Sequence, residues 1–288
     1  MVTMLIGGIL NTILDPLFIF VFHMGTKGAA IATILSQAVS MIWVLAYFFG
    51  GNSVLKIRYK NLKLDAKVVK SIFAIGMSPF SMQLAASIVS IISNRSLVKY
   101  GGDLALGAMG VIMSVVMMVL MPTFGINQGC QPIIGYNYGA KNYKRVKHAL
   151  KLAIIAATCI TVTGFVIIQV FPKQIISLFN KDPELIAIGS HGIKIYLFML
   201  PIIGFQIVSS NYFQAIGKAK TSIFLGLSRQ VILLIPLLFI LPRFFGLDGV
   251  WLSGPSSDAM ASIITAVFIF VEIKHLNKLH DEGADVTI

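Results

Sequence analysis

Three residues that could bind an ion or break a helix, Asn11, Asp15 and Pro16, lie inside a long apolar run. They belong to the stretch LNTILDPLFIF at residues 10–20. A carboxylate such as Asp15 costs about 2.5–3.5 kcal/mol at the centre of a membrane helix, so an acid there is expected to have a function. Asn11 lies four residues earlier and shares its helix face. Pro16 donates no backbone hydrogen bond, which frees the carbonyl of Thr12 near that face. Such oxygen atoms are suitable ligands for a proton, a hydronium ion or a sodium ion.

Thr33 supplies a further oxygen if the chain turns back near residues 25–28. A helix that returns antiparallel after this turn places Thr33 within about one turn of the depth of Asp15, at a rise of about 1.5 Å per residue. Asn11, Asp15 and Thr33 therefore predict a site that binds a proton or another small cation. Two further roles stay open for Asp15: a structural one, as a cap or as the partner of a buried base, and a counter-charge to a substrate.

The composition indicates the surroundings in which these residues fold. The 288 residues are 57% hydrophobic and 12% charged, with a mean hydropathy of +0.87, whereas soluble domains carry about 25% charged residues. The apolar residues gather in runs of about 20, the length of a bilayer-spanning helix. Lipid offers no partner to an open backbone, so we expect an all-α polytopic membrane protein. Its predicted helices are residues 3–24, 29–49, 71–98, 105–126, 148–171, 188–214, 221–242 and 249–273.

Lysine and arginine residues divide the predicted loops into two alternating sets. One set, which includes the interval 50–70 and the segment after residue 273, carries 15 of them, and the other set carries 5. This bias places the first set, and the C-terminus, in the cytoplasm. The net charge of +12 then follows from topology, and no nucleic-acid partner is expected. The two cysteines, Cys130 and Cys159, form no metal or disulfide pattern.

An internal repeat points to a larger architecture. The stretch LDPLFIF at 14–20 resembles LIPLLFI at 234–240, and each is followed by a Gly-x-x-Gly sequence, at Gly25 and at Gly246. Membrane transporters are often built from such repeats. Four predicted helices precede the second copy after the interval 50–70, but none precedes the first. If the two halves are equivalent, this chain holds eight helices of a twelve-helix protein.

Two stretches resemble hallmarks of the multidrug and toxic compound extrusion (MATE) family. The sequence LNxxLDPLFIF, followed by GxxGAAIATxxSQ up to Gln37, is similar to the fifth and sixth helices of that family, and FQAIGKAK at 213–220 fits the turn before its eleventh. Glycines and prolines of the stretch 122–146 predict a tight interfacial turn that ends the preceding helix. The hallmark in that stretch is carried by Gly129, Gln131, Pro132, Gly135, Asn137, Tyr138, Gly139, Ala140, Arg145 and Val146.

The resemblance implies a two-lobe fold of twelve helices that exports cationic or amphipathic compounds against an inward flow of protons or sodium ions. It implies that Asn11, Asp15 and Thr33 belong to the cation site of the N-terminal lobe. Beyond the coupling ion, H⁺ or Na⁺, no cofactor is expected. The expected partners are small amphipathic or cationic molecules and the lipid bilayer, and the full-length protein is expected to be a monomer in the plasma membrane. The implied organisation is 1–49 as the last two N-lobe helices, 50–70 as a basic cytoplasmic linker, 71–273 as a six-helix C-lobe and 274–288 as a cytoplasmic tail.

Polar and flexible side chains mark a candidate substrate cleft. Four polar residues recur at helical spacing and form one stripe. Such a stripe either lines a water-filled cleft or joins neighbouring helices by hydrogen bonds. Methionines on the following helix suit a promiscuous apolar site, with core or lipid packing as the alternative. The candidates are Gln83, Ser87, Ser90, Asn94, Met113 and Met117. Asp258 is a further intramembrane acid, either functional or satisfied locally.

Enzyme patterns are missing from the sequence. It contains no H-E-x-x-H, G-x-S-x-G or phosphate-loop motif, so an enzyme is not expected, although ligands that converge from several helices would not produce such a motif. Two functions compete with multidrug export. In the first alternative the protein is a flippase for lipid-linked saccharides with a related fold. In the second, the chain is a truncated remnant that transports nothing.

Overall fold

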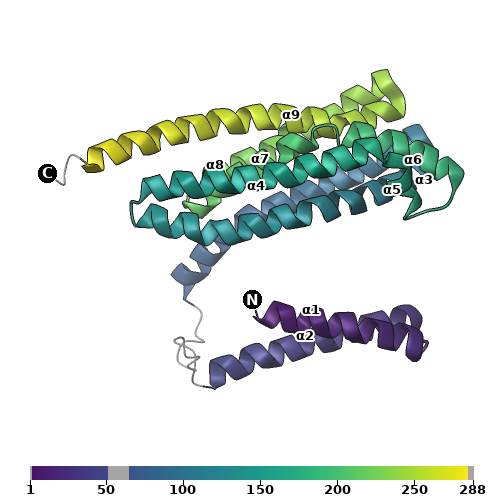
Figure 1. Ribbon diagram of the computed structural model, residues 1–288, viewed down its shortest axis with the longest axis horizontal. Coiled ribbons are helices and arrows are strands. Elements are labelled where there is room, and N and C mark those ends of the chain that lie inside the picture. Colours follow the sequence, from purple (N-terminus) through teal and green to yellow (C-terminus); the bar gives the residue numbers. More distant parts are fainter. Residues whose placement is uncertain (1, 51–64, 285–288) are drawn as a thin grey trace. The chain divides into compact units, whose positions relative to one another are not determined.

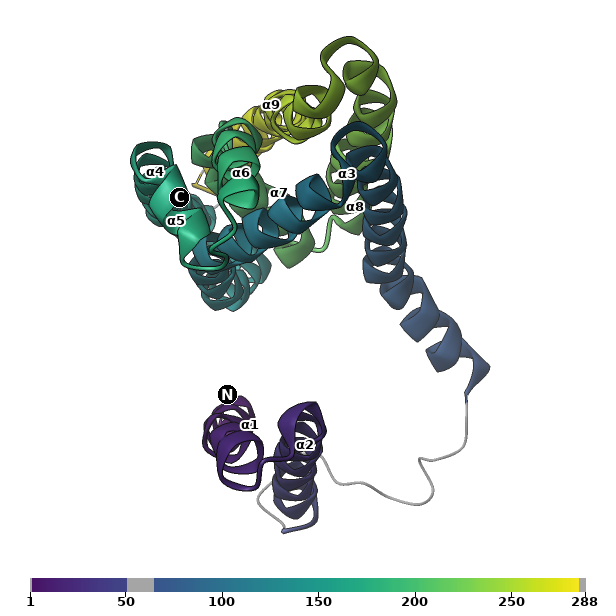
Figure 2. The same cartoon turned by 90° about the vertical axis from the view of Figure 1, so that its right-hand side faces the viewer.

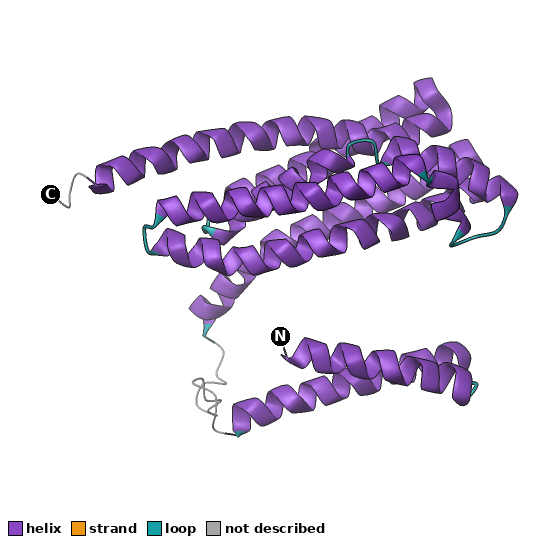
Figure 3. Ribbon diagram, in the orientation of Figure 1, coloured by secondary structure: helices purple, strands orange, loops and turns teal. Residues whose placement is uncertain are grey.

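The computed structural model describes residues 2–50 and 65–284. They belong to two compact units, Met1–Phe73 and Ala74–Ile288. Within the described residues every regular element is a helix, as Figure 3 shows, which confirms the predicted all-α class. Most of the predicted linker, residues 51–64, lies outside the described residues. In the predicted tail, helix continues as far as Ala284.

The first unit is built around a helical hairpin. Helix α1 (Val2–Pro16) passes into the π-helix η1 (Leu17–Val21), and α2 (Gly25–Phe49) follows after a short turn. The wide π geometry begins directly after Pro16, where the missing N–H of proline interrupts the ordinary hydrogen-bond ladder. The turn takes positive φ angles at His23 (54°) and Gly25 (54°). Figure 1 shows the two helices side by side.

Small side chains let the two arms of this hairpin approach closely. Gly28, Ala32 and Ser36 are buried on one face of α2. A Cβ atom on Gly28 would lie 2.8 Å from the carbonyl oxygen of Phe18. Small residues at such spacing allow backbone contact between helices that have no hydrophobic drive to associate in lipid. The hairpin therefore holds Asp15 and Thr33 on arms whose spacing is set by backbone contact.

The second unit contains longer helices, two of which are interrupted. Its elements are α3 (Ala66–Gly139, which begins before the unit boundary), α4 (Tyr143–Val170), α5 (Pro172–Ser177), α6 (Pro183–Tyr196), α7 (Leu200–Ala215), α8 (Ala219–Leu227), the π-helix η3 (Ser228–Leu234) and α9 (Ile235–Ala284). Helix α3 breaks at Gly102 (φ 68°) and α9 breaks at Gly246 (φ 56°). Both angles favour glycine because side chains are strained there. The two parts of α3 run in different directions in Figure 2.

Length and hydropathy give four helical stretches that could each span a membrane within the described residues: Gly25–Phe49, Phe80–Gly139, Tyr143–Val170 and Lys220–Asn277. Helices α6 and α7 form a fifth if they are one span bent by 52°. The 60 residues of Phe80–Gly139 would rise about 90 Å as one straight helix, about three times the thickness of a bilayer core. The breaks at Gly102 and Gly246 fall inside the two overlong stretches.

The hallmark stretch 122–146 was predicted to be a tight turn, but most of it is helical. Helix α3 continues through Pro122 and Pro132 to Gly139, so the predicted helix end at residue 126 is wrong. Only residues 140–142 form the turn, with a positive φ at Lys141 (57°). Proline and glycine are tolerated in membrane helices because neighbouring groups satisfy the freed backbone. They therefore mark helix ends less reliably here than in soluble proteins.

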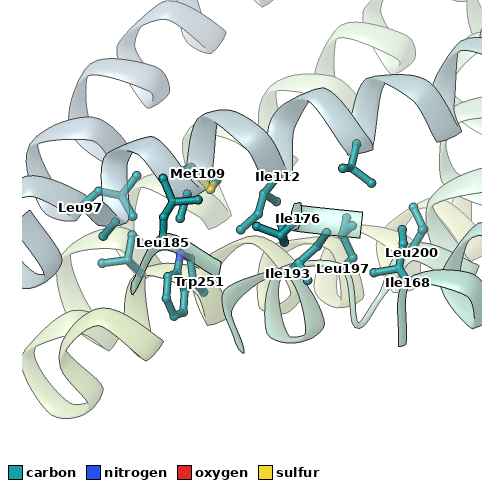
Figure 4. Packing of buried hydrophobic residues seen from close by; sticks show 14 of the residues in the cluster. Leu97, Met109, Ile112, Ile168, Ile176, Leu185, Ile193, Leu197, Leu200 and Trp251 are labelled. Carbon is teal, nitrogen blue, oxygen red and sulfur yellow. The ribbon is translucent and has the colours of Figure 1, made fainter. Parts of the chain in front are cut away.

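Two apolar clusters hold the second unit together. The first, drawn in Figure 4, joins α3, α6 and α9 through side chains that include Leu97, Ile112, Ile193 and Trp251. Trp251 lies against Gly192, where a Cβ atom would come within 2.7 Å of its ring. The second cluster joins α4, α7 and α9 around Tyr212.

Candidate functional site

The structure brings Asn11, Asp15 and Thr33 together, as their spacing predicted. The Asn11 Nδ2 group donates a hydrogen bond to Asp15 Oδ1 at 3.2 Å and another, longer one to Thr33 Oγ1 at 3.5 Å. The first contact is the i, i+4 pair within α1, and the second crosses the hairpin to α2. The Thr33 hydroxyl donates in turn to the carbonyl of Ala29 at 2.9 Å. The amide of Asn11 thus bridges the carboxylate and the hydroxyl.

A cavity of about 320 Å³ opens beside this cluster and is lined by Asn11 and Thr33. Asp15 is half-buried and does not line the cavity. The polar wall of the cavity continues along α2 through Ser36, Gln37 and Ser40. Together with Thr33 these residues recur at helical spacing and face one direction. Sequence reasoning missed them as site residues, although the same periodicity identified the stripe from Gln83 to Asn94.

Asp15 differs from three other acidic residues of the described chain, each of which contacts a basic side chain. Within residues 2–50 and 65–284, ion pairs join Lys218 to Glu272 and Arg229 to Asp258, and His191 hydrogen-bonds to Asp248; none of these contacts involves Asp15. The pairing of Asp15 with a buried base is therefore not seen in the described residues. The described contact of its carboxylate is with the neutral amide of Asn11, which leaves further acceptor positions on its two oxygens open.

Asp258 is satisfied locally, which is one of the two alternatives that its sequence context left open. It is buried, and its Oδ1 accepts a hydrogen bond from Arg229 Nε at 2.5 Å. Arg229 lies in η3 and Asp258 in α9, so the pair crosslinks two elements. A buried carboxylate with a guanidinium partner is satisfied locally.

The candidate cleft residues lie on exposed surfaces of α3. Gln83, Ser87, Ser90 and Asn94 are all exposed, and the Ser87 hydroxyl donates to the carbonyl of Gln83 in its own helix at 3.1 Å. This contact does not join two helices. Of the methionines, Met109 is buried in the core, whereas Met113 (37% exposed) and Met117 (51% exposed) face outward. The cleft assignment stays a prediction.

These features define a polytopic helical membrane protein whose kinked hairpin carries a candidate ion site. The family model described as MatE matches residues 79–240, more than half of the chain. The chain therefore belongs to the MATE family of membrane multidrug efflux transporters, which are not enzymes.

Curated relatives carry a matching description. The chain is 27% identical over 275 residues to the multidrug export protein MepA of Staphylococcus haemolyticus (strain JCSC1435), an alignment that covers 96% of this chain and 60% of the relative. It is 26% identical over 271 residues to MepA of Staphylococcus aureus (strain bovine RF122 / ET3-1), covering 94% and 59%. The chain thus spans about three fifths of the length of these relatives.

Solved structures show the same fold. A MOP superfamily transporter from Pyrococcus furiosus Vc1 superposes with a TM-score of 0.84 at 24% identity, covering 96% of this chain and 62% of that chain. The MATE multidrug transporter DinF-BH, solved in complex with a ligand, superposes with a TM-score of 0.79 at 39% identity, covering 92% and 59%. The first likeness, at this low identity, concerns the fold alone.

Proposed function

We propose that this chain is part of a cation-coupled antiporter that exports amphipathic or cationic compounds and uses Asp15 as its coupling carboxylate. Relatives described as multidrug export proteins support the transport function. The solved ligand complex of DinF-BH supports a small-molecule substrate. The coupling ion is a proton or sodium.

One observation carries the coupling role. The Asp15 carboxylate contacts the amide of Asn11, which also reaches Thr33 across the hairpin, and no ion pair of the described residues includes this acid. A cation that binds Asp15 would compete with the Asn11 amide for the carboxylate oxygen. Loss of that hydrogen bond would release Asn11 toward Thr33 and alter the contact between α1 and α2. Reciprocity then follows, because a substrate that favours one packing changes the affinity of the cation by the same factor.

The proposed architecture has eight membrane crossings in this chain, out of twelve in the whole protein. The breaks at Gly102 and Gly246 divide the two overlong stretches into two crossings each. With α1–η1, α2, α4 and the bent pair α6–α7, eight crossings result. Coverage of about three fifths of each relative supports a larger parent. The parent would place residues 1–49 in its N-lobe and 71–273 in its C-lobe, joined by the 50–70 linker, and would act as a monomer.

Charge supports one orientation of the proposed crossings in the plasma membrane. The excess of lysine and arginine at one end of the helices supports a cytoplasmic linker and C-terminus. The polar stripe from Gln83 to Asn94, with Met113 and Met117, would line the substrate cleft of the parent. Their exposure in the described chain leaves these side chains available to a substrate.

An efflux assay of the full-length parent in proteoliposomes tests the coupling role. Proton and sodium gradients are imposed separately, and Asp15→Asn is compared with Asp103→Asn, an exposed acid of the second unit that takes part in none of the described ion pairs. We expect Asp15→Asn to lose gradient-driven efflux and Asp103→Asn to retain it. Efflux by Asp15→Asn at the wild-type rate, with unchanged gradient dependence, would remove Asp15 from the mechanism.

The same assay with the 288-residue chain alone tests the proposed architecture. A chain with two N-lobe helices in place of six would lack surfaces needed for alternating access, so we expect no efflux. Gradient-driven efflux by this chain alone would contradict the twelve-helix proposal.

A further inference from the structure

The family hallmark includes two residues that the coupling site leaves unused, Asn137 and Arg145. Both line the same groove, a cavity of about 650 Å³ between the end of α3 and the first half of α4. The hairpin turn at residues 140–142 joins these two helices and closes one end of their contact. In Figure 1 the two helices run side by side from that turn.

The groove forms where small residues of α4 lie opposite a stripe of side chains on α3. On α3 the lining residues recur at intervals of four, three and four, from Ile126 to Asn137, so they form one stripe. On α4 the floor is made by Ala149, Ala153 and Ala156. The Cys130 thiol donates to the carbonyl of Ala149 at 3.6 Å, which shows how closely the helices approach.

The length of the groove matches one leaflet of a membrane. The α3 stripe from Ile126 to Asn137 rises about 16 Å at 1.5 Å per residue. Half of a bilayer core is about 15 Å thick. Exposed apolar side chains, Ile133 (52% exposed) and Leu152 (54% exposed), border the groove. Its walls therefore suit a single extended hydrocarbon chain.

Charge is confined to the end near the turn. Arg145 and His148 line the groove there, beside the amide of Asn137, and no carboxylate is among its described lining residues. The opposite end, around Ile126 and Ala156, is entirely apolar. A ligand with an apolar tail and a polar head would fit these two ends. The head should be anionic, because a cationic or neutral head gains no charge attraction from the guanidinium of Arg145.

We propose that this groove binds one anionic phospholipid, with its phosphate on Arg145 and His148 and one acyl chain along Ile133, Leu152 and the alanine floor. Guanidinium groups bind phosphate through paired hydrogen bonds. Basic pockets between membrane helices on the cytoplasmic side are a known kind of site for acidic head groups. The proposal concerns the second unit alone and does not depend on the coupling role of Asp15.

Two free cysteines make the test possible in the full-length protein. Cys130 lines the groove, whereas Cys159 is exposed and lies outside it. The purified parent is placed in nanodiscs of phosphatidylcholine, with or without phosphatidylglycerol. A membrane-permeant maleimide is added, and the labelling rate of each cysteine is read by peptide mass spectrometry. We expect phosphatidylglycerol to slow labelling of Cys130 several-fold and to leave Cys159 unchanged.

Matched variants separate the specific site from general surface charge. Arg145→Gln removes the proposed phosphate ligand, and Lys151→Gln makes the same charge change at an exposed position outside the groove. We expect Arg145→Gln to weaken the protection of Cys130 by about tenfold in lipid concentration, as for a lost charge-assisted hydrogen bond. Lys151→Gln should behave as the wild type. Ala156→Leu, which fills the apolar end, should also reduce protection while Arg145 is intact.

Each remaining outcome overturns the proposal. Protection by phosphatidylcholine alone would mean that the anionic head is not recognised. Full protection by glycerol 3-phosphate or inorganic phosphate without lipid would indicate a free-anion site. Equal labelling of Cys130 with and without phosphatidylglycerol would mean that the groove binds no anionic lipid. Equal effects of Arg145→Gln and Lys151→Gln would mean that the protection of Cys130 depends on general surface charge and not on a specific site.

Discussion

The hairpin of α1 and α2 and its echo in η3 and α9 share a scaffold. Each has a proline near a π-helix, but on opposite sides: η1 begins directly after Pro16, whereas η3 ends two residues before Pro236. Each turns at a glycine of positive φ, 54° at Gly25 and 56° at Gly246. In each, a second glycine three residues later approaches a backbone carbonyl of the preceding arm. The repeat detected in the sequence is thus accompanied by a repeated glycine turn, whereas the π-helices lie at different positions.

The two hairpins differ in how they treat an intramembrane acid. The positions equivalent to Asn11, Asp15 and Thr33 are occupied in the second copy by Val231, Ile235 and Gly254, which offer no polar side chain. The acid of the second copy, Asp258, is tied to Arg229. One scaffold therefore supports either an acid with neutral partners or an acid fixed by a base. The proposed coupling role depends on the first arrangement.

The largest effect is expected from breaking the ion pair of the second copy. Arg229→Leu leaves Asp258 buried without a partner, which should cost about 3–5 kcal/mol in the free energy of unfolding. Thermal unfolding of the purified parent measures this loss. The double variant Arg229→Leu with Asp258→Leu should recover most of the stability. A single variant as stable as the wild type would show that the pair is not structural.

Placing an acid in the second copy tests the importance of the neutral partners. Ile235→Asp should cost about 2.5–3.5 kcal/mol in insertion or stability. It should create no second coupling site, because Val231 and Gly254 provide no donor or hydroxyl. Ion-to-substrate stoichiometry in proteoliposomes gives the answer. A stoichiometry that rises by one cation would show that the acid alone is sufficient.

Both copies should lose stability when a methyl group is added where the two arms approach closely. A Cβ atom at Gly28 would lie 2.8 Å from the Phe18 carbonyl oxygen, and one at Gly249 would lie still closer to that of Leu241. Gly28→Ala and Gly249→Ala should each lower stability by about 1–3 kcal/mol. Gly8→Ala is the control, because no atom lies within 4 Å of a Cβ there. Thermal shifts equal to that of the control would refute the close approach.

The smallest change in stability is expected at the bridging amide. Asn11→Ala removes a partly exposed hydrogen bond and should cost only about 0.5–1.5 kcal/mol. Its effect on coupling should be larger, because Asp15 loses its link to Thr33. The dependence of efflux on pH and on sodium should therefore shift, while thermal unfolding stays close to that of the wild type. Unchanged ion dependence would limit Asn11 to a structural role.

Several parts of the site were predictable because they depend on local periodicity. The i, i+4 spacing of Asn11 and Asp15 placed them on one face, and the antiparallel return brought Thr33 to the same depth. The hydrogen bonds of 3.2 and 3.5 Å agree with both expectations. Ser36, Gln37 and Ser40 follow the same periodicity, so the cavity wall could also have been found from the sequence.

Other features could not be predicted because they depend on partners distant in the sequence. Asp258 could be recognised as locally satisfied only once Arg229, 29 residues away, was found beside it. The helix of α3 continued through Pro122 and Pro132, where local rules predicted a turn. The groove beside Arg145 arises from the contact of two helix faces, neither of which stands out in the sequence.

Composition and spacing by themselves determined that this chain is a set of membrane helices with an acid beside a proline, because hydrophobicity and helical periodicity act over a few turns. The tertiary structure decided which acid has a base as partner, where the helices break and where a groove stays open. The reason is that partners, backbone approach and cavities depend on which helix faces meet, and this is set by the packing of small residues across distant segments.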